Sequence, residues 1–395
     1  MIARRTLLMA ALLAAPAAWA RGAKPAFDLR AIERKRLLRA AKGLLAIAPK
    51  TIAAIPAPRS PAGPQDYYSE GDYWWPDPAN PGGRYVRRDG RSNPDKFDGH
   101  RDALIAFGRT VPALAVLWEL TGEARYAEAA LRHLHAWFVD PATRMNPNLN
   151  HAQAIIGVNS GRAIGVIDTL QIVEVARAAS LFAARKAPGY AAIRAGVERW
   201  FGAYLEWLTG SPFGIEERGQ KNNHGTCWLL QAAAFAALLG RKDVLDAARE
   251  RLRTVIIPAQ IEPDGRQPLE LARTKPYAYS LFNLDVLAAS AWLLGGRELI
   301  AWETRDGRSV AKAIGFMAPY VADKTRWPFA KDIEYWDGFP VRQPSLLFGG
   351  LAVDRADWIT LWKGLNPDPV VPEVVRNFPV RQPLLWLSSD GTPAT

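Results

Sequence analysis

The chain has 395 residues, of which 49% are hydrophobic and 23% are charged, so it is long and apolar enough to bury a core and is excluded from the disordered class. Its single cysteine, Cys227, excludes an intramolecular disulfide. The formal net charge of +11 favours a polyanionic partner, although a basic protein without such a partner is the simpler alternative.

Residues 1–20 have the features of a secretory signal peptide. Arg4 and Arg5 precede a short apolar run that ends in the small-residue sequence A-W-A, which predicts a mature chain that starts near Arg21. The arginine pair leaves both Sec and twin-arginine export open, and we expect a periplasmic or secreted protein. No later stretch reaches about 18 uninterrupted apolar residues, so no membrane attachment is expected after cleavage.

Export and charge together indicate the class of partner. The chain has no Lys/Arg-dense run and no recognised DNA- or RNA-binding motif, so nucleic acid is not the expected polyanion. An acidic polysaccharide fits both the positive charge and the exported location.

Most of the remaining sequence has the periodicity of paired helices. Residues 110–122, with Thr110 as N-cap and Pro112 in the first turn, and residues 126–140 form one predicted helical hairpin. Further helices are predicted at about 28–48, 161–186, 189–208, 226–240, 243–256, 280–295, 307–320 and 345–363. No stretch has the repeated alternation of a large sheet.

Helix pairs without a clear sequence period form either an open solenoid or a closed toroid, and the uneven polar loops favour closure. We therefore predict an all-α protein, an incomplete (α/α) toroid with long active-site loops. A single domain is predicted over residues 21–395, and we expect a monomer.

The longest predicted loop, residues 66–100, is crowded with Pro, Gly, Tyr and Trp. It is too long for a simple connection, and we interpret it as an ordered wall or lid over a cleft, with a packed surface loop as the alternative. Its residues Tyr73, Trp74 and Trp75 are candidate stacking surfaces for sugar rings. The segment after Pro367 is predicted to be an irregular tail.

Three polar clusters stand at the starts of apolar helices. They lie in NPNLNHAQAIIGVNSGRAIG (146–165), in KNNHG (221–225) and in EPDGRQPLELARTKPYAYSLFNLDVLAA (262–289). Capping accounts for the asparagines of the second cluster but not for its histidine. Helix starts in neighbouring hairpins can face one cavity, so we expect these clusters to meet.

Motifs for other chemistry are missing from the sequence. There is no H-E-x-x-H, no cysteine pair and no G-x-S-x-G, Walker or dinucleotide motif. His133 and His135 lie two apart in a predicted helix and point to different faces, so they are not expected to chelate a metal.

The three clusters together resemble the alginate lyase superfamily of α/α-toroid polysaccharide lyases. The resemblance rests on N-N-H-G before an apolar helix, on E-L-A-R-T-x-x-x-x-Y-S-x-F-N-L downstream, and on N-H-A-Q-A-x-x-G-V-N-S-G-R upstream. It spans roughly residues 66–320. It implies β-elimination on 1,4-linked uronate polymers, with poly-mannuronate alginate as the preferred substrate and glucuronan as the close alternative. The implied mechanism requires no metal or organic cofactor.

The resemblance implies four catalytic residues. Tyr279 would act as base and acid, with its pKa lowered by His224 and Arg273, while His224, Arg273 and Asn223 would offset the negative charge of the uronate. One tyrosine can serve both steps when C5–H and O4 lie on the same ring face, as in mannuronate or glucuronate. Guluronate would require His224 as the base. Substrate contacts are predicted at Tyr73, Trp74, Trp75, His151, Gln153, Asn159, Arg162 and Asn222.

Each assignment has an alternative. His224 can be a capping or core histidine, Arg273 can pair with Glu270, and Tyr279 can be an ordinary buried aromatic. A glycoside hydrolase on the same fold would need two carboxylates. The carboxylates available for that role are Asp98, Asp102, Glu262, Asp264 and Glu270. A non-catalytic binder of acidic polysaccharide is the third class.

Overall fold

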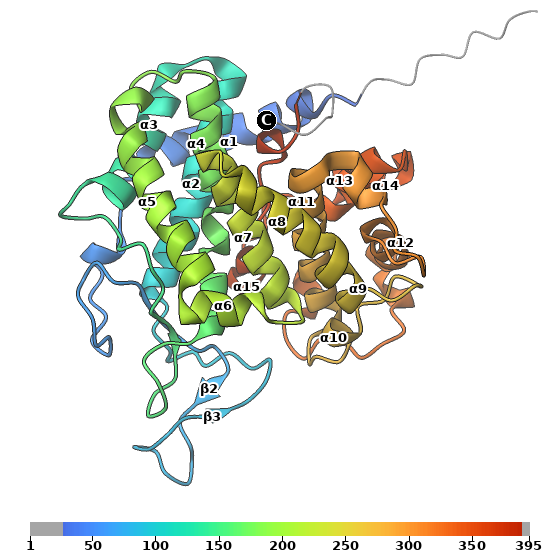
Figure 1. Ribbon diagram of the computed structural model, residues 1–395, viewed down its shortest axis with the longest axis horizontal. Helices are drawn as coiled ribbons and strands as arrows, with labels where there is room; N and C mark the ends of the chain where they lie inside the picture. The colour runs from blue at the N-terminus through green and yellow to red at the C-terminus, as the bar shows by residue number, and fades with distance from the viewer. Residues whose placement is uncertain (1–26, 389–395) are drawn as a thin grey trace, which may run out of the picture.

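The computed structural model describes residues 27–388, which form helices and two small sheets (Figure 1). The predicted signal peptide lies outside the described residues. The helices are α1 (Leu29–Ala46), η1 (Ile52–Ala54), α2 (Gly99–Thr121), α3 (Ala124–Leu134), η2 (His135–Val139), η3 (Ala163–Ile172), α4 (Val173–Ala184), α5 (Tyr190–Gly210), α6 (Pro212–Arg218), α7 (Asn223–Leu239), α8 (Lys242–Arg251), η4 (Leu252–Ile256), α9 (Ile257–Gln260), α10 (Pro268–Leu271), α11 (Pro276–Ala301), α12 (Val310–Ala322), η5 (Lys324–Arg326), η6 (Trp336–Gly338), α13 (Pro344–Ala352), α14 (Ala356–Gly364), α15 (Pro372–Arg376) and η7 (Pro383–Leu385). The strands are β1 (Tyr68–Glu70), β2 (Trp74–Trp75), β3 (Val86–Arg87) and β4 (His151–Ala154).

The helices form two layers. Helices α2, α4, α7, α11 and α13 pack against one another in chain order and make up the inner layer. Outside them, α3 packs on α2, α5 and α8 pack on α7, α12 packs on α11, and α14 packs on α13. This is the predicted all-α, (α/α)-toroid architecture. Helices α2 and α11 are the two in residues 27–388 that are long and apolar enough to cross a membrane, but most of their residues are buried inside the fold.

The C-terminal segment runs into the centre of the helical layers. The backbone N–H groups of Arg381 and Gln382 and the indole N–H of Trp386 all donate to Glu174 on α4, at 2.9–3.0 Å. The indole of Trp292 on α11 donates to the carbonyl of Trp386 at 2.9 Å. The segment predicted to be an irregular tail is therefore packed inside the protein, and it contains α15, which lines a cavity described below.

Two predicted helix boundaries are wrong. Helix α2 begins at Gly99 and not at Thr110, because Pro112 removes only one hydrogen bond and the buried stripe of Leu104, Phe107, Val111 and Leu114 extends past it. The predicted helix 345–363 is two helices, α13 and α14. They are separated at Asp354, whose φ of 54° a helix cannot contain.

The stretch 66–100 is ordered, as predicted. Strand β1 pairs in parallel with β4, and β2 pairs with β3 in an antiparallel hairpin that projects from the helices (Figure 1). We call residues 71–98 the flap. Its start and middle are tied to the next polar loop, since Gly71 N donates to Ala154 O at 2.9 Å and Tyr85 N to Ile156 O at 3.1 Å.

A buried carboxyl group between α11 and α13 gives a testable dependence of stability on pH. Asp285 accepts hydrogen bonds from the N–H and hydroxyl of Ser345 at 3.1 and 2.6 Å, and burial raises the pKa of its carboxyl to about 8. The native state therefore holds a proton that the unfolded chain releases near pH 4, so the free energy of unfolding falls as pH rises from about 4 towards 8. Asp285→Asn keeps the shape of the protonated acid. We expect it to remove a slope of up to about 1.4 kcal/mol per pH unit.

Urea unfolding of both proteins at about pH 5 and about pH 8 measures this slope. The variant should gain stability over the wild type at the higher pH. Parallel pH dependences would contradict the assignment.

Candidate active site

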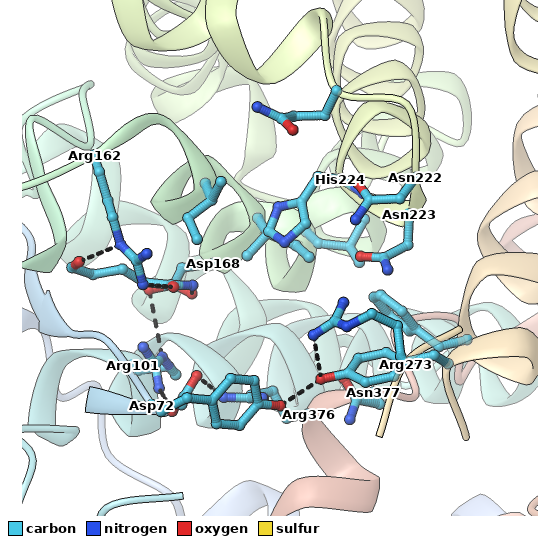
Figure 2. Close-up of a pocket in the computed structure, with 18 of the residues that line it drawn as sticks. Asp72, Arg101, Arg162, Asp168, Asn222, Asn223, His224, Arg273, Arg376 and Asn377 are labelled. Carbon is cyan, nitrogen blue, oxygen red and sulfur yellow. Dashed lines mark hydrogen bonds and ion pairs between the residues drawn. The ribbon is translucent and has the colours of Figure 1, made fainter. Parts of the chain in front are cut away.

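A cavity of about 340 Å³ opens where the starts of α7 and α11 meet the flap, η3 and α15 (Figure 2). Within the described chain it is lined by five arginines, namely Arg87, Arg101, Arg162, Arg273 and Arg376. The carboxylates that line it are Asp72 and Asp168. No group of three or more His, Cys, Asp or Glu side chains in residues 27–388 is placed to hold a metal ion.

The sequence KNNHG builds the start of α7. The side chain of Asn222 caps the helix by accepting from the N–H of His224 at 3.3 Å. Gly225 lies against the chain that arrives from α6, and a Cβ atom at this position would lie 2.1 Å from the carbonyl oxygen of Gln220. The glycine therefore permits the close approach that brings α6 next to His224.

Two buried carboxylates hold the residues that follow the cap. Glu217 Oε1 lies 2.7 Å from His224 Nδ1, and the two oxygens of Glu270 accept from the N–H and the amide nitrogen of Asn223 at 2.7 and 2.8 Å. Burial raises the pKa of both carboxyl groups, against the stabilising contacts of His224 and Asn223. His224 and Asn223 themselves line the cavity, so Nε2 of the imidazole and the second amide hydrogen of Asn223 remain for a ligand.

Tyr279 lies on the first turn of α11 with its hydroxyl held on two sides. This oxygen is 2.5 Å from the hydroxyl of Tyr73 and 3.3 Å from Nη2 of Arg273. Arg273 also pairs with Asp89 of the flap at 3.2 Å. Glu270 binds Asn223 instead, so the alternative in which Arg273 pairs with Glu270 is not what the structure contains.

The predicted lowering of the Tyr279 pKa is wrong in this structure. Burial and the neighbouring Tyr73 raise the pKa of Tyr279 well above its ordinary value and outweigh Lys275 and Arg273. Burial likewise raises the pKa of Tyr73. At neutral pH Tyr279 is therefore a phenol, which suits proton donation directly and proton abstraction only after the phenol has lost its proton.

The cavity brings the predicted catalytic residues together. His224, Asn223, Arg273 and Tyr279 all line it. In Figure 2, His224 and Asn223 lie along one side of the open space, and Arg273 and Arg376 lie along the other. The hydroxyl of Tyr279 belongs to the second side because Arg273 binds it.

Five of the eight predicted substrate contacts line the cavity, namely Tyr73, Trp74, Gln153, Arg162 and Asn222. The guanidinium of Arg162 donates to the backbone oxygen and the side-chain oxygen of Gln153 at 2.8 and 3.2 Å and lies 5.8 Å from the ring centroid of Trp74. Burial lowers the pKa of Arg162 to about 10. Because both of its acceptors are neutral, its positive charge is available to an anionic sugar.

Three predicted substrate contacts do not line the cavity. Trp75 packs under the guanidinium of Arg88, 5.1 Å from its ring centroid. Asn159 uses its side-chain oxygen to accept from the N–H of Ile155 at 3.2 Å and so closes a turn. His151 and Gln153 both belong to β4, but the strand is irregular and Gln153 has a φ of 50°. Their side chains therefore do not share one face of the strand.

The sequence analysis missed a buried ion network in the wall of the cavity. Asp72 binds Arg101 at 2.6 Å and Arg376 at 2.5 Å, and Arg101 also reaches Asp168 at 3.4 Å. Burial works against a charged Asp72, but Arg101 and Arg376 outweigh it and hold the pKa of Asp72 low. Arg376 and Asn377 come from the predicted tail, where nothing in the local sequence marks a site.

Comparisons with known proteins agree with this geometry. A family model of alginate lyases matches residues 51–327, whereas a search of curated proteins found no match. Among solved structures, an alginate lyase from Bacteroides ovatus is 31% identical, with 90% of this chain and 92% of that chain covered and a TM-score of 0.77.

More distant structures share the fold. Alginate lyase A1-III from Sphingomonas species A1 is 17% identical, with 83% and 88% of the two chains covered and a TM-score of 0.50. A variant of alginate lyase A1-III complexed with a tetrasaccharide is 16% identical, with 86% and 90% covered and a TM-score of 0.54. On the extent of the family match and the 31% identity, the chain belongs to the alginate lyase family of polysaccharide lyases.

Proposed function

We propose that this protein cleaves 1,4-linked uronate polymers by β-elimination, with poly-mannuronate alginate as its preferred substrate. The observation that carries the proposal is the Tyr279 hydroxyl, bound by Arg273 inside a cavity rich in arginine. The names of the similar structures, which are alginate lyases, support an alginate-like polymer.

The charge of the cavity supports an acidic sugar. Each uronate unit carries one carboxylate, and five arginines face two carboxylates in the lining described above. Both hydrogen-bond acceptors of Arg162 are neutral oxygens of Gln153. Arg273 forms an ion pair with Asp89 of the flap. A planar guanidinium can grip a carboxylate with two parallel hydrogen bonds, so both arginines suit uronate binding.

The residues present can perform elimination in three parts. Arg273 and the amide of Asn223 offset the charge that builds on the uronate carboxylate when the C5 proton leaves. In mannuronate, C5–H and O4 lie on one ring face, so Tyr279 takes the proton from C5 and gives one to O4. Burial opposes the phenolate that this requires, while Lys275 and Arg273 stabilise it.

The carboxylates of the structure do not favour the hydrolase alternative. Among the described residues, Asp72 and Asp168 line the cavity, and both bind Arg101. A hydrolase needs one carboxylic acid with a raised pKa, whereas the pKa of Asp72 is lowered. Glu270 is buried behind Asn223.

The other carboxylates proposed for hydrolysis lie elsewhere. Asp98 and Asp102 line a neighbouring hollow, on the other side of Asp72, Arg101 and Arg376, that also contains Lys96. Glu262 and Asp264 pair with Arg266.

Turnover of defined polyuronates tests the proposal. Elimination creates an unsaturated uronate end that absorbs ultraviolet light, whereas hydrolysis and simple binding do not. We expect the absorbance to rise fastest with poly-mannuronate, more slowly with glucuronan, and not at all with a neutral β-1,4-glucan. Release of reducing ends without absorbance would favour a hydrolase, and binding without either product would favour a non-catalytic binder.

A further inference from the structure

Glu217 is a buried carboxylate with one partner. It lies at the end of α6 with no exposed surface, and its Oε1 is 2.7 Å from His224 Nδ1. Its other oxygen, Oε2, is buried and has no hydrogen-bond partner within residues 27–388. Burying a carboxylate that has a single hydrogen-bond partner costs free energy. The contact with the imidazole is therefore the interaction that offsets the cost of burying Glu217.

The contact determines the form of the imidazole. A carboxylate accepts a hydrogen bond from Nδ1–H, which leaves Nε2 without a hydrogen and with its lone pair free. The same carboxylate stabilises the imidazolium that forms when Nε2 takes a proton. Glu216 and Asp168 also act on the Glu217 carboxyl, and Arg273 acts with His224 on the Glu270 carboxyl, so charges of both signs surround the pair.

His224 and the Tyr279 hydroxyl lie on different sides of the cavity. His224 lies with Asn223 on one side in Figure 2, and Arg273, which binds the Tyr279 hydroxyl at 3.3 Å, lies on the other. A sugar ring between the two sides therefore presents one face to a proton acceptor and the other to a proton donor. In guluronate C5–H and O4 lie on opposite ring faces, which matches this arrangement.

We infer that Glu217 is a positioning residue that makes His224 the base for guluronate units, so that one cavity cleaves both C5 epimers. The inference rests on the proposed function and names a residue beyond it. His224 Nε2 takes the C5 proton, and the electron pair of that bond forms the C4–C5 double bond. The C4–O4 bond breaks, its electron pair goes to O4, and O4 takes the proton of Tyr279. Water then returns a proton to Tyr279 and removes one from His224.

The variant Glu217→Gln tests the inference. Its amide either presents only a neutral oxygen to Nδ1 or donates to Nδ1 and forces the hydrogen onto Nε2, and both outcomes weaken the base. We expect kcat on poly-guluronate to fall about 10- to 100-fold, the loss usual when the partner that orients a metal-bound histidine is removed. On poly-mannuronate, for which Tyr279 is the base, we expect a change of less than about threefold.

A matched control comes from the second buried carboxylate. Glu270→Gln alters the support of Asn223, which offsets the uronate charge for either epimer. It should therefore lower the rates on both polymers by the same factor. The acidic limb of the pH–rate profile on poly-guluronate should change in Glu217→Gln and stay unchanged in Glu270→Gln, a difference that a purely structural role would not produce.

Several outcomes overturn the inference without touching the proposed function. These are a wild type that cleaves poly-mannuronate and not poly-guluronate, or equal losses on both polymers in Glu217→Gln. If that variant does not fold, the ¹⁵N NMR shifts of His224 in the wild type decide, since a hydrogen on Nε2 at neutral pH contradicts the assignment. Failure of the wild type on every polyuronate would instead overturn the proposed function itself.

Discussion

Tyr279→Phe is expected to lower kcat on every polyuronate by about 10²- to 10⁴-fold, the usual contribution of a general acid–base group. The variant loses only the hydroxyl, which lies within hydrogen-bonding distance of Tyr73 and Arg273, and it keeps the ring that packs under the Arg273 guanidinium at 4.3 Å. Initial rates by ultraviolet absorbance measure the loss. The loss should fall on kcat with little change in KM, because the hydroxyl acts on the reacting atoms.

The pH dependence of the rate distinguishes the role of the Tyr279 hydroxyl as a base from its role as an acid. Because burial raises the pKa of Tyr279, a reaction that needs its phenolate should become faster as pH rises above neutrality. This is expected for poly-mannuronate with the wild type. Tyr73→Phe is the control variant. It removes the hydroxyl that lies 2.5 Å from the Tyr279 hydroxyl and leaves Tyr279 itself unchanged. Normal turnover by Tyr279→Phe would contradict the acid–base assignment.

The local motifs could be predicted because their residues are neighbours in sequence. Asn222 and Asn223 mark a helix start by their chemistry, and Arg273 and Tyr279 are six residues apart at the next one. A helix start exposes free N–H groups and directs nearby side chains into one space, so two such starts form a site. The resemblance to a known family added their roles.

The state of Tyr279 could not be predicted in the same way. The positive groups expected near it, His224 and Arg273, argued for a lowered pKa. Its burial and its contact with Tyr73, which lies 206 residues earlier, depend on how the flap packs. Desolvation is a property of the assembled cavity, and it outweighs the charges that the sequence displays.

The sequence also could not show that two of the predicted substrate contacts, His151 and Trp75, do not line the cavity, because it does not display the local backbone geometry or packing. Alternation along a strand would have placed His151 and Gln153 on one face. The left-handed backbone of Gln153 breaks that alternation, and no glycine or proline announces it. Trp75 was attractive as a sugar platform by composition alone, but its ring is used by Arg88 of the same hairpin.

Arg101→Met is expected to lower the free energy of unfolding by about 3–5 kcal/mol, the usual cost of removing one partner of a buried ion pair. Arg101 is buried at the first turn of α2 and binds Asp72 at 2.6 Å, Asp168 at 3.4 Å and the backbone oxygen of Glu70 at 3.1 Å. Methionine has a comparable length and cannot replace these contacts. Asp72 and Asp168 would then remain buried with one positive charge fewer beside them.

Urea unfolding with an exposed pair as control measures this effect. Arg355→Met removes the partner of Asp357, where both side chains are at least half exposed, and should cost less than about 1 kcal/mol. Equal effects of the two substitutions would contradict the role of Arg101. Adding Asp72→Asn to Arg101→Met should cost less than the two single effects combined, because the second change removes a charge that the first has left unpaired.

The arginines that line the cavity suit an acidic polymer, but when no polymer is bound their mutual repulsion must be offset within the protein. Asp72 and Asp168 do this while contributing no proton to the proposed chemistry, which is why a sequence search for acid and base residues does not find them.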